Sequence, residues 1–231
     1  MKHKNKHFVI AIDGPAGAGK STVAKMVAEK LGFLYVDTGA MYRALTFKAL
    51  KQKLDLKNKK ELIDMAKKST IELLQVKGSY KVFLDGQDVT EEIRTEEISK
   101  NSHFVACIPE IRELLWNIQR SYREHNDIVM EGRDIGTIVF PDAQLKIFLD
   151  ASIEERTKRR HSQLKQQGID IDIETLRQEI IKRDEKDRKR DIAPLKKHPN
   201  AIVIDTTNMT IEEEVTLIID LYKKIAKESS L

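Results

Sequence analysis

Short apolar runs rich in β-branched residues recur along the chain, and amphipathic stretches separate most of them. The runs that have the length of a strand are residues 8–12, 33–36, 128–130, 145–149 and 201–204. Short apolar strands that alternate with helices are typical of a parallel sheet that is covered on both faces. The pattern therefore predicts an α/β fold.

One region departs from this alternation. The runs 70–75 and 80–84 flank residues 77–79 (KGS), which have the composition of a turn, so we expect an antiparallel hairpin. Asp85-Gly86 predicts a second tight turn, and residues 87–90 a third short strand. A small antiparallel module thus interrupts the alternating strands and helices.

We place this inserted module at about residues 60–105, which leaves 1–59 and 106–231 as the α/β core. Of the 231 residues, 40% are hydrophobic and 34% are charged, which is typical of a globular protein with a solvated surface. No apolar run approaches the ~20 residues that span a bilayer, so no membrane partner is expected. The single cysteine, Cys107, lies in an apolar stretch at 104–108, where we expect it to be buried; with no disulfide possible, a cytoplasmic location is expected.

The sharpest local signal follows the first predicted strand. Residues 14–21 read GPAGAGKS and fit the pattern G-x-x-x-x-G-K-[ST], whose glycines let backbone N–H groups turn toward a phosphate. A helix expected over 21–31 adds its positive end, Lys20 reaches the β- and γ-phosphates, and the Ser21 hydroxyl suits Mg²⁺. The predicted ATP-binding residues are Gly14, Pro15, Ala16, Gly17, Ala18, Gly19, Lys20, Ser21 and Thr22.

A phosphate loop of this kind indicates a nucleotide but leaves the chemistry open. A GTPase would also need an N-K-x-D motif, and the nearest string, residues 58–61 (NKKE), follows no strand and is better explained as a helix cap. Transfer to a small phosphorylated acceptor instead needs cations that gather several negative charges in one place. Arginines beyond strand ends or along one helix face are therefore the next candidates.

Two clusters follow predicted strands, and ligands bind at the carboxyl ends of parallel strands. Residues 37–43 read DTGAMYR and place Arg43 on a helix that begins after Gly39. Residues 131–134 read EGRD, in which the acid suits Mg²⁺ or its waters and Arg133 can clamp a phosphate. Taken alone, a capped helix start and a turn with a surface salt bridge would explain the two strings.

Two further clusters lie on predicted helices. Arg183, Asp187 and Arg190 share one face of a helix expected over 173–189, because they are spaced by helical offsets. The other cluster follows the fourth predicted strand and consists of Arg156, Arg159 and Arg160. These arginines could form a lid that closes over ATP and excludes water. Two solvated helices with intrahelical ion pairs are the plainer explanation of the same charges.

Taken together, these strings resemble bacterial cytidylate kinase, a family of nucleoside monophosphate kinases. The strings are IDGPAGAGKST from Ile12, DTGAMYR from Asp37, DVTEEIRT from Asp88, EGRDIGTIVFPDA from Glu131, KIFLDAS from Lys146 and RDEKDRKRDIAPL from Arg183. The resemblance implies a P-loop kinase with a five-stranded parallel sheet, an inserted module that binds the monophosphate, and a short lid at about 154–168. It implies the reaction ATP + CMP → ADP + CDP, with Mg²⁺ accompanying ATP and dCMP also accepted.

Carried over by position, the resemblance places Arg43 and Arg133 on the acceptor phosphate, and Arg183 and Asp187 on the pentose. The residues that it implies around the cytosine are Thr38, Arg112, Asp134 and Arg190, with Tyr42 completing the substrate pocket. An Asp there is chemically sensible, since cytosine has an N4 donor where uracil has an acceptor. The family often has Ser where this chain has His103, so the preference between ribose and deoxyribose stays open.

The catalytic residues that the resemblance implies are Lys20, Arg43, Arg133, Arg156 and Arg159. Mg²⁺ is expected on Ser21, with Asp37 or Glu131 contributing directly or through water. The family also implies a monomer whose partners are ATP and CMP or dCMP, and no nucleic acid.

Two other functions remain compatible with the sequence. The first is a kinase of another small phosphate acceptor, such as UMP. The second is a P-loop module that binds RNA through the basic stretch 155–190; against it, no Phe, Tyr or Trp lies between Ala151 and Asn200 to stack on bases.

Overall fold

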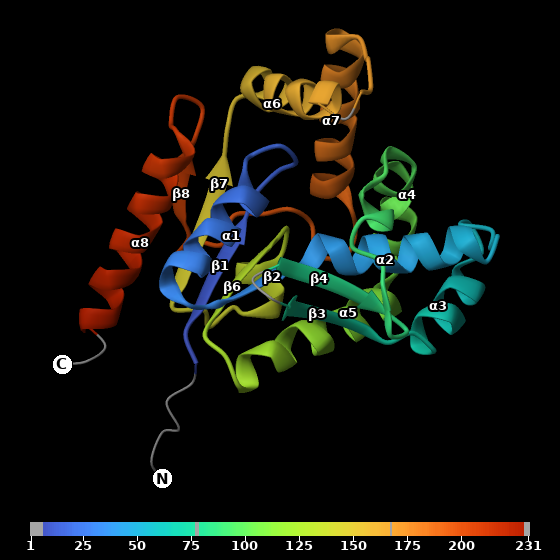
Figure 1. Cartoon of the computed structure of the whole chain (residues 1–231), viewed down its shortest axis with the longest axis horizontal. Coiled ribbons are helices and arrows are strands. Elements are labelled where there is room, and N and C mark those ends of the chain that lie inside the picture. Colours follow the sequence, from blue (N-terminus) through green and yellow to red (C-terminus); the bar gives the residue numbers. More distant parts are fainter. Residues whose placement is uncertain (1–6, 77–78, 167, 229–231) are drawn as a thin grey trace.

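The computed structural model describes residues 7–76, 79–166 and 168–228. Five of its strands are β1 (Val9–Asp13), β2 (Leu34–Asp37), β6 (Ile128–Gly132), β7 (Leu145–Asp150) and β8 (Ile202–Asp205). They form one parallel sheet in the order β2-β6-β1-β7-β8 (Figure 1). Each strand lies within a residue or two of a predicted run, which confirms the α/β fold.

Helices cover both faces of this sheet (Figure 1). The helices that pack on it are α1 (Lys20–Leu31), α2 (Thr38–Lys51), α5 (Pro109–Ser121) and α8 (Ile211–Glu228). Successive side chains of a strand point to opposite faces, so Ile10 and Ile12 of β1 join a core with α1 and α8. Val9 and Ala11 join a second core with α2 and α5. Burial on both faces explains why β1 is apolar throughout.

The predicted inserted module is present. Its elements are α3 (Lys59–Lys67), β3 (Ile71–Val76), β4 (Ser79–Leu84), β5 (Gln87–Asp88), the short 3₁₀-helix η1 (Glu92–Arg94) and α4 (Glu96–Ala106). β3, β4 and β5 form an antiparallel sheet, which confirms the hairpin and the third strand. Asp85 (φ 51°) and Gly86 (φ 78°) form the second turn in the left-handed region that two-residue hairpins favour. The first turn, predicted at 77–79, lies mostly outside the described residues.

Two local expectations have opposite outcomes. Asn58 caps α3 by accepting a hydrogen bond from the N–H of Glu61, which confirms that residues 58–61 are a helix start. The expectation that Cys107 is buried is wrong, because its side chain is exposed. The apolar stretch around it ends a helix, so Val105 and Ile108 point inward while Cys107, the C-cap of α4, points out.

A pair of helices, α6 (Ile153–Gln166) and α7 (Ile173–Lys189), stands beyond the carboxyl ends of the strands (Figure 1), and α6 contains most of the predicted lid, about 154–168. The two helices have a small apolar core of their own, made by Leu164, Leu176 and Ile180. None of the helices in the described part of the chain combines the length and apolar character needed to cross a membrane.

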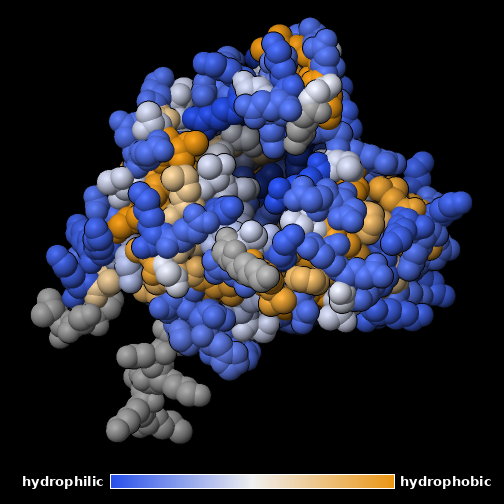
Figure 2. All heavy atoms as spheres, in the orientation of Figure 1, coloured by the Kyte–Doolittle hydropathy of each residue, from blue (hydrophilic) through white to orange (hydrophobic). Residues whose placement is uncertain are grey.

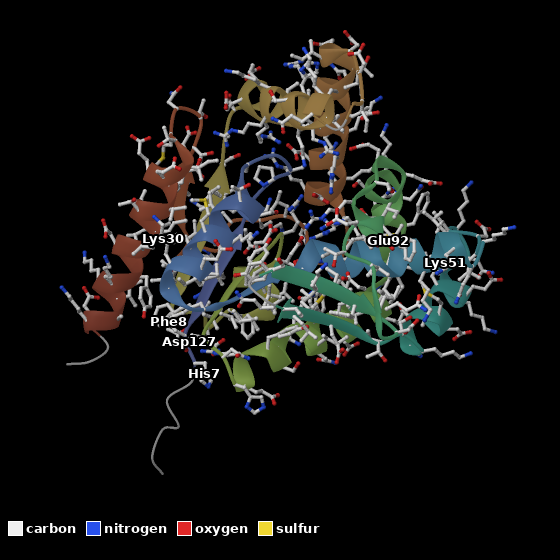
Figure 3. All side chains as sticks on the ribbon, viewed as in Figure 1. His7, Phe8, Lys30, Lys51, Glu92 and Asp127 are labelled. Carbon is white, nitrogen blue, oxygen red and sulfur yellow. The ribbon has the colours of Figure 1, made fainter. Side chains whose placement is uncertain are left out.

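At the opposite edge of the sheet, where the strands begin, side-chain contacts join β1 to the residue before β6. His7, Phe8 and Asp127 lie together there (Figure 3). The Asp127 carboxylate accepts the N–H of Phe8 at 2.7 Å and contacts Nδ1 of His7 at 3.2 Å. This contact fixes the relative height of β1 and β6, so the loops that follow both strands emerge at the same level.

The turn from β1 into the following loop is crowded. Gly14 has φ +153°, and a Cβ built on it would lie 2.0 Å from the carbonyl oxygen of Leu149 in β7. Gly32 also has a positive φ, +70°, but nothing lies within 4 Å of its Cβ position. Gly14 is therefore required by both backbone conformation and space, whereas Gly32 is required by conformation alone.

We predict that Gly14→Ala lowers the free energy of unfolding far more than Gly32→Ala. The control substitution adds only left-handed strain, worth about 1 kcal/mol. Gly14→Ala also pushes β7 away from β1, so a loss on the order of 3 kcal/mol is expected. Urea unfolding followed by circular dichroism measures both values, and equal losses would contradict the structure.

Candidate active site

The predicted site residues meet because three strands end at the same edge of the sheet. Asp13 of β1 lies opposite Gly132 of β6, and Asp37 of β2 lies opposite Glu131 of β6. The phosphate loop, the DTGAMYR helix and the EGRD turn therefore begin side by side. Figure 2 shows a hollow on this face of the molecule, lined by strongly hydrophilic residues and lying between the lid and the inserted module.

Lys20 is the first residue of α1 and is 5% exposed. Its Nζ donates to the carbonyl oxygen of Pro15 at 2.7 Å, within its own loop. Burial, reinforced by the positive charge of Arg133, lowers the pKa of Lys20 to about 7. An anion bound beside Lys20 would stabilise its charged form, so this loop is prepared for a phosphate.

Side-chain oxygens of Ser21, Tyr35 and Glu131 lie close together after the phosphate loop. Ser21 Oγ donates to Oε1 of Glu131 at 2.5 Å, and the Tyr35 hydroxyl donates to the same oxygen at 3.2 Å. Burial and the nearby Asp37 charge raise the pKa of Glu131. Two carboxylates and a hydroxyl at this spacing suit a hard cation such as Mg²⁺.

Asp37 and Thr38 also have structural contacts. The Asp37 side chain caps α2 at the N–H of Ala40, and its second oxygen pairs with Arg43 at 2.8 Å. Thr38 Oγ1 donates to the carbonyl oxygen of Glu131 at 2.7 Å. In the described ranges, no group of three or more His, Cys, Asp or Glu side chains is arranged to hold a metal ion. Mg²⁺ commonly uses one or two carboxylates with substrate phosphates, which fits the smaller set here.

The arginines of the predicted second anion site converge on this loop. Arg133 Nε pairs with Oδ2 of Asp187 at 2.9 Å, which joins the EGRD turn to the lid helix α7. The Arg183 side chain makes no hydrogen bond or ion pair with another described residue. Partial removal from water and the adjacent positive charges of Arg133 and Arg43 lower the pKa of Arg183 to about 10. A cluster of cations with too few acids attracts anions.

A cluster of aromatic and cationic side chains surrounds Asp134, and we refer to this cluster as the Asp134 pocket. Oδ2 of Asp134 accepts from Nε1 of Trp116 at 2.8 Å and lies 2.9 Å from Nη2 of Arg112. Arg112 is 1% exposed and lies between the rings of Tyr42 and Trp116, with its Cζ 5.2 and 5.5 Å from their centroids. Arg190 Nη2 lies 3.9 Å from the other Asp134 oxygen, Oδ1.

Three buried polar atoms around Asp134 have no hydrogen-bond partner among the described residues. They are the hydroxyl of Tyr42, Nε of Arg112 and Nη2 of Arg190. Leaving such an atom unpaired costs about 1–3 kcal/mol, so three in one place indicate groups that pair with water or with a ligand. These atoms are therefore available to a polar ligand.

Asp13 links this pocket to the phosphate loop. Its carboxylate oxygens accept the N–H groups of Ile135 at 2.8 Å and Gly136 at 2.7 Å. Both residues belong to the π-helical turn η3 (Ile135–Val139) that directly follows Asp134. Burial raises the pKa of Asp13 to about 7 despite these two hydrogen bonds. Asp13, which precedes Gly14, thus holds the backbone on which Asp134 stands.

The three predicted lid arginines have different surroundings. Arg156 is buried, donating to the carbonyl oxygen of Ala16 at 3.1 Å and pairing with Asp184. Arg159 donates to the carbonyl oxygen of Thr206 at 2.7 Å. Arg160 instead joins the cation cluster, because the charge of Arg43 contributes to lowering its pKa after burial.

Ion pairs connect the lid with the inserted module. Arg160 of α6 pairs with Glu96 of α4, and Lys100 of α4 pairs with Glu179 of α7 at 2.9 Å. His103 of α4 contacts the carbonyl oxygen of Lys100 through Nδ1 at 2.8 Å. Burial lowers the pKa of His103, and the lid charges that act on it include Arg183 and Asp187. His103 therefore faces the residues with which the pentose is expected to interact.

Sequence reasoning missed several residues of the site. Trp116 lies four residues after Arg112 on α5, and this helical offset was the available signal. Asp13 directly precedes the phosphate loop, but nothing in the sequence showed where its carboxylate points. Glu214 of α8 was missed for the same reason: it is 1% exposed, and its Oε2 would lie 3.7 Å from a Cβ on Gly19.

Known proteins resemble this chain over most of its length. A sequence model of the family described as cytidylate kinase matches residues 10–224. The cytidylate kinase of Alkaliphilus oremlandii is 51% identical over 216 residues, which cover 94% of this chain and 98% of that protein. The cytidylate kinase of Bacillus subtilis is 48% identical over 215 residues, covering 93% and 96%. A crystal structure of an uncharacterized protein from Eubacterium ventriosum shares the fold, with a TM-score of 0.51, 16% identity and coverage of 95% and 99%.

The buried carboxyl of Glu214 gives a prediction about pH. Its Oε2 has no hydrogen-bond partner in the described structure, and burial raises its pKa to about 7 from an ordinary value of 4.5. Because the pKa is higher in the folded protein than in the unfolded chain, the carboxyl contributes its full stabilisation at a pH below the pKa of the unfolded chain. This stabilisation is lost as the pH rises through about 7. Glu214→Gln stays neutral, so its melting temperature should gain on that of the wild type between pH 5 and pH 8.

The neighbouring Glu213 is the matched control. It accepts from the N–H and hydroxyl of Thr210, which lowers its pKa, so its contribution is present above the ordinary pKa and lost as pH falls. Glu213→Gln should therefore melt below the wild type at pH 8. A Glu214→Gln difference that does not change with pH would contradict the burial of its charge.

Proposed function

Since the chain belongs to the cytidylate kinase family, we propose that it transfers the γ-phosphoryl group of ATP to CMP, giving ADP and CDP. The observation that carries the proposal is the pocket around Asp134, whose unpaired polar groups match the edge of cytosine. The phosphate loop and the arginine cluster support the same reaction, because they provide two anion sites in one hollow.

Cytosine presents two acceptors, O2 and N3, and one donor, the N4 amine. In the pocket, Nε of Arg112 and Nη2 of Arg190 are unpaired donors, and the Tyr42 hydroxyl can donate as well. Oδ1 of Asp134 is an acceptor suited to the amine. In uracil, O4 is an acceptor where cytosine has the N4 donor, and N3–H is a donor where cytosine has an acceptor. The O4 of uracil would therefore lie against the Asp134 carboxylate and be repelled by it. The pocket therefore favours CMP over UMP.

The phosphates would occupy the cation cluster. Lys20 would leave the carbonyl oxygen of Pro15 for the β- and γ-phosphates, and Arg43 and Arg133 would surround the acceptor phosphate. Arg183, which the resemblance places on the pentose, lies near both of these arginines and would add its charge to the same phosphate. A phosphate is already a nucleophile, so no side chain has to act as a general base. Catalysis then consists of aligning the two phosphates and neutralising their charge, which these fixed cations can do.

Mg²⁺ is part of this proposal. The Ser21 hydroxyl and the carboxylates of Glu131 and Asp37 would hold the ion, directly or through water, beside the ATP phosphates. The raised pKa of Glu131 supports a cation there, because a positive charge relieves the repulsion between the two carboxylates. The ion would neutralise charge on the transferred phosphoryl group.

The module at about 60–105 and the lid at about 154–168 would close over CMP and ATP respectively. The pairs Arg160–Glu96 and Lys100–Glu179 support this arrangement, because they already join the two parts. The pentose would lie between His103 and the lid helix. dCMP is proposed as a second acceptor, because the resemblance to the family implies it.

The proposal is tested by measuring ADP formation from ATP and Mg²⁺ with CMP, dCMP, UMP, AMP and GMP offered separately. We expect rapid turnover with CMP and dCMP and little with the others. Asp134→Asn should lower kcat/KM for CMP by on the order of 100-fold and reduce the preference over UMP, because it removes the charged acceptor. Slow ATP hydrolysis with no acceptor preference would overturn the proposal.

A second prediction isolates the acceptor phosphate. Arg183→Ala should reduce kcat/KM for CMP by roughly 100-fold or more, because it removes a cation with no structural partner to replace. Arg188→Ala, on the same helix and also exposed, is the matched control because no charge of the cation cluster acts on it, and it should change kcat/KM by less than about twofold. Steady-state kinetics of the two variants measures both changes in kcat/KM. Equal changes in the two variants would argue against a phosphate contact at Arg183.

A further inference from the structure

The two oxygens of the Asp134 carboxylate have different surroundings. Oδ2 accepts from Nε1 of Trp116 at 2.8 Å and from Arg112 at 2.9 Å. A carboxylate oxygen has about two lone-pair sites, so these two donors use the hydrogen-bonding capacity of Oδ2. Oδ1 lies 3.9 Å from Nη2 of Arg190, beyond hydrogen-bond distance, and keeps its capacity to accept.

We infer that Trp116 is a positioning residue that fixes the orientation of the Asp134 carboxylate and so sets the preference for cytosine over uracil. The inference rests on the proposed function, in which Asp134 reads the exocyclic amine. It extends that function, because Trp116 acts through Asp134 rather than through the base.

Arg112 alone would not fix the carboxylate in this orientation. A guanidinium carries several donors in a planar fork and can engage one carboxylate oxygen or both. A bidentate contact would occupy Oδ1, the oxygen needed for the amine. The indole has a single donor in a fixed direction, and its ring is held against the Arg112 guanidinium at 5.5 Å. Trp116 therefore holds Oδ2 and leaves Oδ1 to the ligand.

The position of Oδ1 decides which base the carboxylate favours. Oδ1 attracts the N4 amine of cytosine and repels O4 of uracil. Turning the carboxylate would weaken both effects, because Oδ1 would no longer face the exocyclic group of the base.

The experiment compares Trp116→Phe with Tyr122→Phe. Trp116→Phe keeps an aromatic ring and removes the indole N–H. Tyr122 is the C-cap of the same helix. Tyr122→Phe also removes one hydrogen bond, the one that the Tyr122 hydroxyl accepts from the N–H of Leu73 at 2.8 Å. Both variants are assayed for kcat and KM with CMP and with UMP, and for melting temperature. The control thus measures the effect of losing one hydrogen bond on stability alone.

We expect Trp116→Phe to raise KM for CMP by about 10-fold with kcat changed less than about threefold, and to lower the CMP-over-UMP ratio of kcat/KM by about 10-fold. Tyr122→Phe should lower the melting temperature and leave the ratio unchanged. A ratio that is unchanged in Trp116→Phe, or reduced equally in both variants, overturns the inference.

Asp134→Asn separates this inference from the proposed function. If Asp134→Asn leaves the CMP-over-UMP ratio unchanged, base reading by Asp134 is wrong and both fail. If it lowers the ratio and Trp116→Phe does not, only the inference about Trp116 fails. In the double variant, Trp116→Phe should lower the ratio no further, because its effect passes through the same carboxylate.

A binding measurement needs no substitution and covers the case in which Trp116→Phe does not fold. Trp116 is the only tryptophan in the chain, so its fluorescence reports on this pocket. Titrating the wild-type protein with CMP, without ATP, should change the indole emission, and UMP at the same concentration should change it less. An emission that stays unchanged at CMP concentrations shown by calorimetry to be saturating overturns the inference.

Discussion

The parallel register of β1 with β6 is the constraint on which the rest of the structure depends. It places Asp13 opposite Gly132, so the phosphate loop and the EGRD turn leave the sheet at the same height and side by side. Asp13 then extends the pairing beyond the strands by accepting the N–H groups of Ile135 and Gly136. A single carboxylate thereby couples the donor side of the hollow to the acceptor side. A shift of one residue in this register would separate Lys20 from Arg133 and turn the base pocket away from the phosphates.

The charges of the site are only partly balanced by the protein. Lys20 bonds to a carbonyl oxygen rather than to an acid, and its pKa is lowered to about 7. Arg156 likewise uses the carbonyl oxygen of Ala16, although it also has Asp184. Carbonyl oxygens are weak partners for cations, so a phosphate can displace them at little cost. Incomplete pairing destabilises the folded protein somewhat, and it is what makes the hollow attractive to two nucleotides.

Much of this structure could be predicted from the sequence, and the limit has a physical cause. Apolar runs predicted the five strands, because burial on both faces leaves a continuous signal in a short segment. The loop and the arginines that follow strands were found because strand ends share an edge of the sheet. Cys107 and Trp116 were misjudged or missed because a helix periodicity shows which side chains share a face and not what that face contacts. The sequence also could not show that Arg160, rather than Arg156 or Arg159, lies near the cation cluster, because all three arginines lie on one short helix.

Base recognition and phosphate binding use different physics within one hollow. In the proposed function, the phosphates would meet cations whose partners can be exchanged, so affinity would arise from charge that the protein leaves unbalanced. The base would meet a pocket in which Arg112 is enclosed by two rings and one oxygen of Asp134 already has two donors. Selectivity would then depend on which hydrogen-bonding atoms remain unpaired, and neighbours such as Trp116 would decide this without touching the ligand. Discrimination between two bases that differ in a few polar atoms is thus determined as much by the interior packing of α5 as by the pocket surface.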